Sequence, residues 1–185
     1  MKQILAVLAP ATCLALLTAF CVGLASQAMN GLRSTSDSIY LMHFTLGLFT
    51  VLFALGVHSL IFIYFLGTGR WVKEVALAYG IADAPLPKLT RDLKRRTFPP
   101  ALIAMLVPIA TAAAGAAVQW RDLNWTVHFS LGLATLAVNV WAFWVEYHNV
   151  SINVDVIEEV LREVDRIRAS HGLPSNAEAL RQEQA

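Results

Sequence analysis

The sequence predicts an all-α integral membrane protein in which four transmembrane helices form a bundle. Hydrophobic residues make up 57% of the 185 residues and charged residues only 15%, whereas about a quarter of a soluble domain is charged. Charged residues are absent from four long stretches, which lie between Lys2 and Arg33, Asp37 and Arg70, Arg96 and Arg121, and Asp122 and Glu146. This composition argues against a soluble enzyme, a nucleic-acid-binding protein and a disordered chain.

Each uncharged stretch is long enough to cross a membrane as a helix, because a hydrocarbon core of about 30 Å requires about 20 residues. A helix also satisfies its own backbone hydrogen bonds where water is absent. We therefore expect transmembrane helices near residues 4–27, 40–67, 99–119 and 125–148, with Pro99 and Pro100 in the first turn of the third. Lys2 and the small residues Ser26 and Ala28 also fit a signal peptide, but the first apolar run is long for one, which favours a retained helix.

The basic residues predict how these helices are oriented. Seven of them lie in the segment 68–98, which the sequence predicts to be a loop, whereas Arg33 and Arg121 are alone in the two other connections. Short loops on the cytoplasmic side of a membrane carry an excess of Lys and Arg. We therefore expect a multi-pass protein of a bacterial-type inner (plasma) membrane, with the 68–98 segment and both termini in the cytoplasm.

Residues 151–185 are predicted to lie outside the membrane-spanning unit formed by residues 1–150. Between residues 152 and 170, apolar residues recur at helical spacing and charged residues occupy the opposite face, which predicts a cytoplasmic amphipathic helix. Whether it is separate from the fourth helix or continuous with it stays open. Gly172 and Pro174 predict the end of this helix, and a polar tail follows.

An internal repeat begins the second and fourth predicted helices. Residues 43–50 read HFTLGLFT and residues 128–135 read HFSLGLAT, so six of eight positions are identical at an offset of 85 residues. This pattern predicts two duplicated helical hairpins, related by an axis along the membrane normal, as in other membrane proteins with parallel repeats. The repeat places His43 and His128 at the same depth.

The repeated histidines predict a site for one b-type haem between the second and fourth helices. Imidazole is a common axial ligand of haem iron, so His43 and His128 are the predicted iron ligands. Gly47 and Gly132 each follow a histidine by four residues, which puts them on the same helix face and leaves space for a flat macrocycle. Arg33 and Arg121 are the cations available for its propionates. The pattern is broadly similar to small four-helix membrane cytochromes b, although no family motif matches residue by residue.

A second polar site is predicted deeper in the bundle. Glu146 follows His128 by 18 residues, which is five helical turns, so that both residues share one helix face with Asn139. His58 lies at a depth between Asn139 and Glu146, with Tyr64 nearby. Polar groups in membrane helices face the bundle interior and mark function or helix pairing. Proton transfer, a quinone headgroup, a metal ion or a structural hydrogen bond would each suit this group.

The function expected from these sites is electron transfer in the membrane, with quinone as a candidate partner and the redox partner unspecified. Three alternatives stay open: a non-redox structural or assembly subunit of a larger complex, a metal or transport site at the inner group, and a chlorophyll-type pigment bound by His43 and His128. The absence of a CxxCH motif excludes a covalently attached c-type haem. The expected partners are the lipid bilayer and either a second copy or other membrane subunits, and no nucleic acid.

Overall fold

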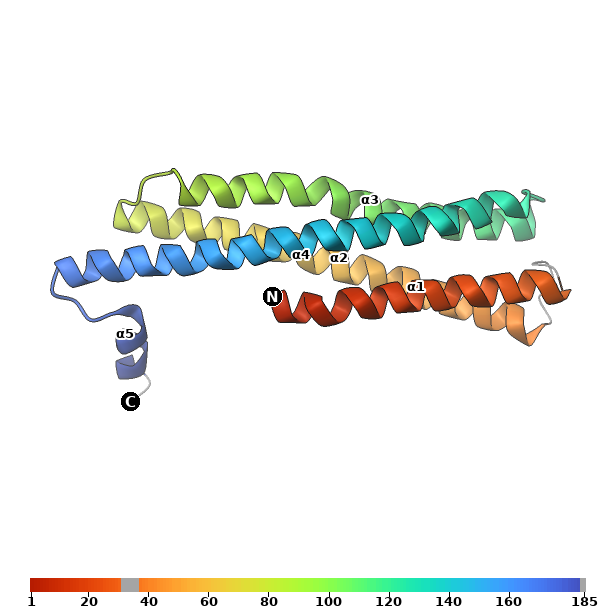
Figure 1. Ribbon diagram of the computed structural model, residues 1–185, viewed down its shortest axis with the longest axis horizontal. Helices are drawn as coiled ribbons and strands as arrows, with labels where there is room; N and C mark the ends of the chain where they lie inside the picture. Colours follow the sequence, from red (N-terminus) through yellow and green to blue (C-terminus); the bar gives the residue numbers. More distant parts are fainter. Residues whose placement is uncertain (31–36, 184–185) are drawn as a thin grey trace.

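The computed structural model describes residues 1–30 and 37–183, and these residues form five helices and no strand. The helices are α1 (Lys2–Asn30), α2 (Ser38–Tyr79), α3 (Leu86–Trp120), α4 (Trp125–Ser170) and the short α5 (Asn176–Glu183). Figure 1 shows α1 to α4 side by side in one elongated bundle, with α5 folded away from the end of α4. We call the end at which α2 and α4 begin the cap end, and the opposite end, next to α5, the tail end.

The four long helices are each long and apolar enough to cross a membrane, so the chain is a multi-pass membrane protein. Large apolar side chains cover the outside of the bundle, for example Val7, Leu52, Ile63 and Trp144, which are each at least 60% exposed. An apolar surface of this extent is stable against lipid and unstable in water. The lipid bilayer is therefore the surroundings that this surface requires.

Two helices occupy the centre of the bundle. Both α1 and α3 pack against α2 and α4, and α2 and α4 face each other through ring contacts and hydrogen bonds that begin with His43 and His128 at the cap end. A core cluster of Leu5, Val57, Ile61, Phe65, Leu93, Phe143 and Val150 draws on all four helices. A second cluster of Val72, Val156 and Val160 continues the core between α2 and α4 toward the tail end.

The predicted loop at 68–98 is wrong, because most of that segment is helical. The α2 helix continues to Tyr79, and α3 begins at Leu86. Gly80 ends α2 with φ of 66°, a left-handed conformation that glycine adopts without strain. Asp83 then accepts two hydrogen bonds from Arg91, at 2.6 and 2.7 Å, which closes the turn. The basic residues mark the edge of the apolar region, and a helix continues past that edge as long as its backbone bonds are satisfied.

The expected position of Pro99 and Pro100 is also wrong, since both lie inside α3 and not in its first turn. A proline inside a helix removes one backbone hydrogen bond, and α3 continues through the pair. The fourth helix continues past residue 148, so the continuity that the sequence left open is what the structure shows. It forms one element with the segment expected to be a cytoplasmic amphipathic helix, in which Val156, Val160 and Val164 are buried. At 46 residues, α4 extends about 69 Å.

Side-chain caps fix where α2 and α4 begin. Asp37 accepts a hydrogen bond from the backbone N–H of Ile39, and Asn124 accepts one from the N–H of Thr126. These acceptors satisfy N–H groups that have no partner within the helix. His43 and His128 therefore lie in the first two turns of their helices, near the cap end.

Candidate functional site

A cavity lies between the four long helices at the cap end, and both repeated histidines line it. It contains about 1320 Å³ of empty space, counting the part that is open to the surroundings. Its walls are mostly apolar, with Phe20, Leu48 and Trp125 among the lining residues, and Tyr40 is one of its few polar ones. Apolar walls with a few placed polar groups are typical of ligand and cofactor sites.

Each histidine in the cavity is held by a backbone carbonyl of the neighbouring helix. Nδ1 of His43 lies 3.0 Å from the carbonyl oxygen of Ala19 in α1, and Nδ1 of His128 lies 2.9 Å from that of Thr111 in α3. A carbonyl oxygen can only accept, so Nδ1 of each ring is the donor. The second ring nitrogen, Nε2, then keeps a free lone pair in the neutral ring. This is the usual arrangement of a histidine that binds a metal.

Two glycines that the sequence did not single out lie directly beneath these rings. A Cβ added to Gly23 would stand 2.6 Å from Cε1 of His43, and one added to Gly115 would stand 2.9 Å from Cε1 of His128. Each glycine lies four residues beyond the carbonyl that holds the same ring. The sequence does carry a signal for them, since Gly-x-x-x-Gln occurs at 23–27 and again at 115–119.

Gly47 and Gly132, which the sequence predicted to leave space for a flat macrocycle, both line the cavity, but their surroundings differ. Nothing lies within 4 Å of a Cβ added to Gly47, so the face above it is open. At Gly132 the same atom would stand 3.1 Å from the ring of Phe20, which packs at 5.6 Å against Phe129. A flat group therefore has room beside Gly47, and it reaches Gly132 only if Phe20 turns aside.

The two imidazole rings face each other across the cavity, with centroids 6.0 Å apart and planes at 73°. A metal bound to both Nε2 atoms by bonds of about 2 Å would hold the centroids about 6.3 Å apart. No group of three or more His, Cys, Asp or Glu side chains that could hold a metal ion occurs among the described residues. Two ligands suffice for haem iron, because the macrocycle supplies four nitrogens. The residues present therefore fit haem better than a bare ion.

The predicted propionate partners add little to this fit. Arg33 lies outside the described residues, and Arg121 is exposed beyond the end of α3.

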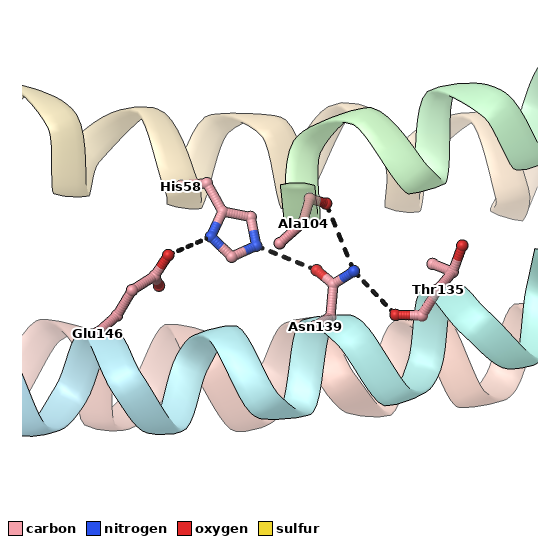
Figure 2. Close-up of polar contacts among 5 residues, drawn as sticks. All are labelled: His58, Ala104, Thr135, Asn139 and Glu146. Carbon is pink, nitrogen blue, oxygen red and sulfur yellow. Dashed lines mark hydrogen bonds and ion pairs between the residues drawn. The ribbon is translucent and has the colours of Figure 1, made fainter. Parts of the chain in front are cut away.

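The inner polar site is a buried chain of three side chains. Nδ1 of His58 lies 2.7 Å from Oε1 of Glu146, and Nε2 lies 3.0 Å from Oδ1 of Asn139 (Figure 2). All three residues have no exposed surface. The structure thus brings together the residues that the helical spacing had grouped. Tyr64 is not among them, because its hydroxyl accepts from Asn153 at 3.0 Å, closer to the tail end.

The orientation of Asn139 determines which nitrogen of His58 carries a hydrogen. The side-chain nitrogen of Asn139 donates to the carbonyl of Thr135 at 2.9 Å and to that of Ala104 at 3.5 Å. The Ala104 carbonyl is available because residue 108, which would otherwise donate to it within α3, is a proline without an N–H. Oδ1 of Asn139 therefore faces His58 and accepts from Nε2. Any further proton of the pair lies between Nδ1 and Glu146.

The cavity and the inner site are connected by side chains. The Thr111 carbonyl holds His128, and the Thr111 hydroxyl lies 2.7 Å from that of Thr135. The Thr135 carbonyl in turn accepts from Asn139. On the other side, the ring of His58 stacks on Phe143 at 4.5 Å and 11°. These contacts hold the inner histidine in one orientation.

The fold and the two sites define a class: an all-α multi-pass membrane protein with a histidine-lined cavity at one end and a buried histidine–glutamate pair below it. No protein-family model, no curated protein and no solved structure is significantly similar to the chain.

Proposed function

We propose that the protein binds one b-type haem in the cavity, where His43 and His128 would hold the iron, and transfers single electrons within the membrane. One observation supports this most directly. Both rings donate Nδ1 to a backbone carbonyl, so two free Nε2 atoms are available at a centroid distance of 6.0 Å. When bound, haem supplies the one-electron chemistry.

The chain itself orients the ligands and surrounds them with mostly apolar walls. The Ala19 and Thr111 carbonyls fix the tautomer and the direction of each ring, and hydrogen bonds of this kind raise ligand basicity. Gly23 of α1 and Gly115 of α3 have no side chain, which lets the Cε1 edge of each ring approach the backbone of the neighbouring helix closely. The apolar walls lower the local dielectric, a property by which proteins tune the potential of a haem.

The pairing of residues across the bundle supports the duplicated hairpins as part of this proposal. His43 faces His128, and His58 stacks on Phe143, and both pairs are separated by 85 residues in the sequence. In each proposed hairpin the first helix supplies a carbonyl and a glycine, and the second supplies the histidine. A pseudo-twofold axis between α2 and α4 accounts for both pairs.

The environment of the electron transfer follows from the charge distribution. We propose a bacterial-type inner membrane with both termini and the tail end in the cytoplasm, because the basic residues gather near the tail end. Exposed apolar side chains such as Phe44 and Leu48 line the cavity, so a partner that arrives through the lipid reaches it. Quinones are such carriers, and they are the partner class that we propose. A second copy or another membrane subunit is the proposed protein partner.

The test is the visible spectrum of the protein, purified from haem-replete cells, before and after reduction with dithionite. We expect a sharp reduced α-band of the b type, lost in His43→Ala and in His128→Ala. His148→Ala is the matched control, because this histidine of α4 is exposed and lies outside the cavity. A colourless protein would overturn the proposal in favour of a structural subunit, and a pigment spectrum without redox response would favour a chlorophyll-type ligand. Reoxidation by a quinone analogue tests the partner.

A further inference from the structure

The structure assigns a second function to the buried pair: we infer that His58 and Glu146 form a proton-binding site that exchanges protons with the tail end of the bundle. This inference does not depend on the haem. It rests on the hydrogen-bond geometry of the pair, on a buried oxygen without a partner, and on the polar residues that lead from Glu146 to the tail end.

The pair holds one proton in a single short contact. Because Asn139 fixes Nε2 as a donor, only the contact of 2.7 Å between Nδ1 and Oε1 of Glu146 remains to share a proton. With one proton there, the pair has no net charge, whether the proton lies on the nitrogen or on the oxygen. Burial in apolar surroundings strongly favours such a neutral state. The pair is thus a defined proton site and not a permanent ion pair.

A second proton has a defined place to bind. Oε2 of Glu146 is buried and has no hydrogen-bond partner among the residues that the structure describes. An ionised carboxylate has about four acceptor sites, and here the protein uses only one oxygen. A proton that arrives at Oε2 turns Glu146 into a neutral acid and leaves the proton on Nδ1 of His58. The pair then carries one positive charge, and release of the second proton returns the pair to its neutral state.

Among the described residues, no third ionisable group forms a hydrogen bond or ion pair with His58 or Glu146. From Phe98 to Trp120, α3 has no ionisable side chain. Three ionisable residues border the neighbouring core cluster, namely Met1 with its amino group, Cys13 and Tyr64. Of these, only the Met1 amino group carries a charge at neutral pH in its ordinary state. On α4, Tyr147 and His148 are exposed on the outside of the bundle. A change in the charge of the pair is therefore a net uptake or release of a proton.

Polar residues lead from Glu146 toward the tail end. Asn149 and Asn153 follow Glu146 on the same buried face of α4, at three and seven residues. The Asn149 side chain donates to the Thr97 hydroxyl at 2.9 Å, and Asn153 donates to Thr68 at 3.1 Å as well as to Tyr64. Oδ1 of Asn153 is a second buried oxygen without a partner in the described part of the chain. The Thr97 and Thr68 hydroxyls donate to the carbonyls of Leu93 and Tyr64, so among the described residues the vacant acceptors on this side are Oε2 of Glu146 and Oδ1 of Asn153.

The opposite side of the pair is blocked. Nε2 of His58 contacts the amide oxygen of Asn139 directly, and the Asn139 amide donates to two carbonyls. The oxygen and both hydrogens of this amide are bound to fixed partners, whereas Oε2 of Glu146 and Oδ1 of Asn153, on the tail side, have no partner among the described residues. A proton that leaves the pair toward the cavity would have to pass through this group. Exchange therefore runs toward the tail end.

Infrared spectroscopy of the purified full-length protein in lipid nanodiscs tests the inference. We expect a buried carboxylic-acid band that changes in intensity with pH, shifts in D₂O, and disappears in Glu146→Gln. Glu159→Gln is the matched control, because Glu159 of α4 is exposed, and it should leave the band unchanged. In protein with ¹⁵N-labelled histidine, the His58 signals should show Nε2 protonated throughout and Nδ1 following the band.

The direction of exchange is tested by the rate at which the band responds to a pH jump. Asn153→Leu should slow the response about tenfold, the effect of losing roughly one hydrogen bond along the route, whereas Thr135→Val should not change it. Thr68→Val serves the same purpose if Asn153→Leu does not fold. A band and His58 signals that do not change with pH would overturn the proton site. A response slowed by Thr135→Val and unaffected by Asn153→Leu would overturn the direction.

Discussion

Replacing Gly23 with alanine should disrupt the cavity through the ring of His43. The new Cβ would stand 2.6 Å from Cε1 and 2.9 Å from Nδ1 of that ring. To reach the shortest ordinary contact of 3.4 Å, the ring must retreat by about 0.8 Å. Metal–ligand distances tolerate about 0.2 Å, so the displaced ring cannot keep both its carbonyl and a metal. The backbone beneath the ring is the fixed part, and His43 has to move.

The size of the effect follows from the cost of overpacking. An inserted methyl group in a packed interior costs about 1 to 3 kcal/mol, which corresponds to roughly a 5-fold to 150-fold loss of haem affinity. Gly115→Ala should have a smaller effect, because its Cβ would stand 2.9 Å from Cε1 of His128. Gly69→Ala is the control, since its nearest neighbour, in Thr90, is at an ordinary 3.8 Å.

The assay is haem titration of each purified variant, followed by the reduced α-band, with helix content measured by circular dichroism as a check on folding. The expected order of affinity loss is Gly23→Ala, then Gly115→Ala, then Gly69→Ala. Wild-type affinity in Gly23→Ala, together with wild-type helix content, would refute the reasoning that the ring rests on the backbone at this point.

Three further changes test separate features. Gly47→Ala should lower haem affinity without lowering thermal stability, because the new Cβ enters open space in the cavity. Gly56 lies outside the cavity, so Gly56→Ala is the control, and equal haem affinity in the two variants would contradict the prediction. Glu146→Ala should lower the free energy of unfolding by about 3 kcal/mol, since it leaves a buried polar partner unpaired, and Glu146→Gln should cost less; denaturation in detergent measures both. The Arg91 side chain beside Asp83 holds the pKa of that carboxyl below its usual range. Its contribution to stability is therefore present at neutral pH and disappears as the pH falls below about 4 through the lowered pKa, so melting temperatures of Asp83→Asn should show less loss in acid than those of the wild type.

The membrane-spanning character of the chain could be predicted from sequence, but the ends of its helices could not. The stretches of sequence without charged residues indicate where each apolar region begins and ends, and four such stretches predicted four membrane spans. A charge does not end a helix, however. Arg70 and Asp155 both lie within continuous helices, since a helix that leaves the membrane keeps its backbone bonds and needs only a polar surface.

The candidate sites were predictable as far as periodicity within one helix allows. The spacing from His128 through Asn139 to Glu146 placed these residues on one face, and the structure turns Asn139 and Glu146 toward His58. The residues that support the rings could not be found in this way. Gly23 and Gly115 matter because of what lies opposite them on another helix, and a single helix pattern does not contain that information.

Pro108 has a consequence beyond its own helix. Because Pro108 of α3 has no N–H, the Ala104 carbonyl is free to accept a hydrogen bond from Asn139 of α4. The orientation of Asn139 then determines that Nε2 of His58 on α2 carries a hydrogen. Three helices must therefore be in the correct register for one histidine to hold its hydrogen on Nε2. Sliding α3 by a single residue, about 1.5 Å, would take Ala104 out of hydrogen-bonding range. The ¹⁵N signal of Nε2 of His58 therefore reports whether the three helices are in register, and it can be measured in any variant or lipid.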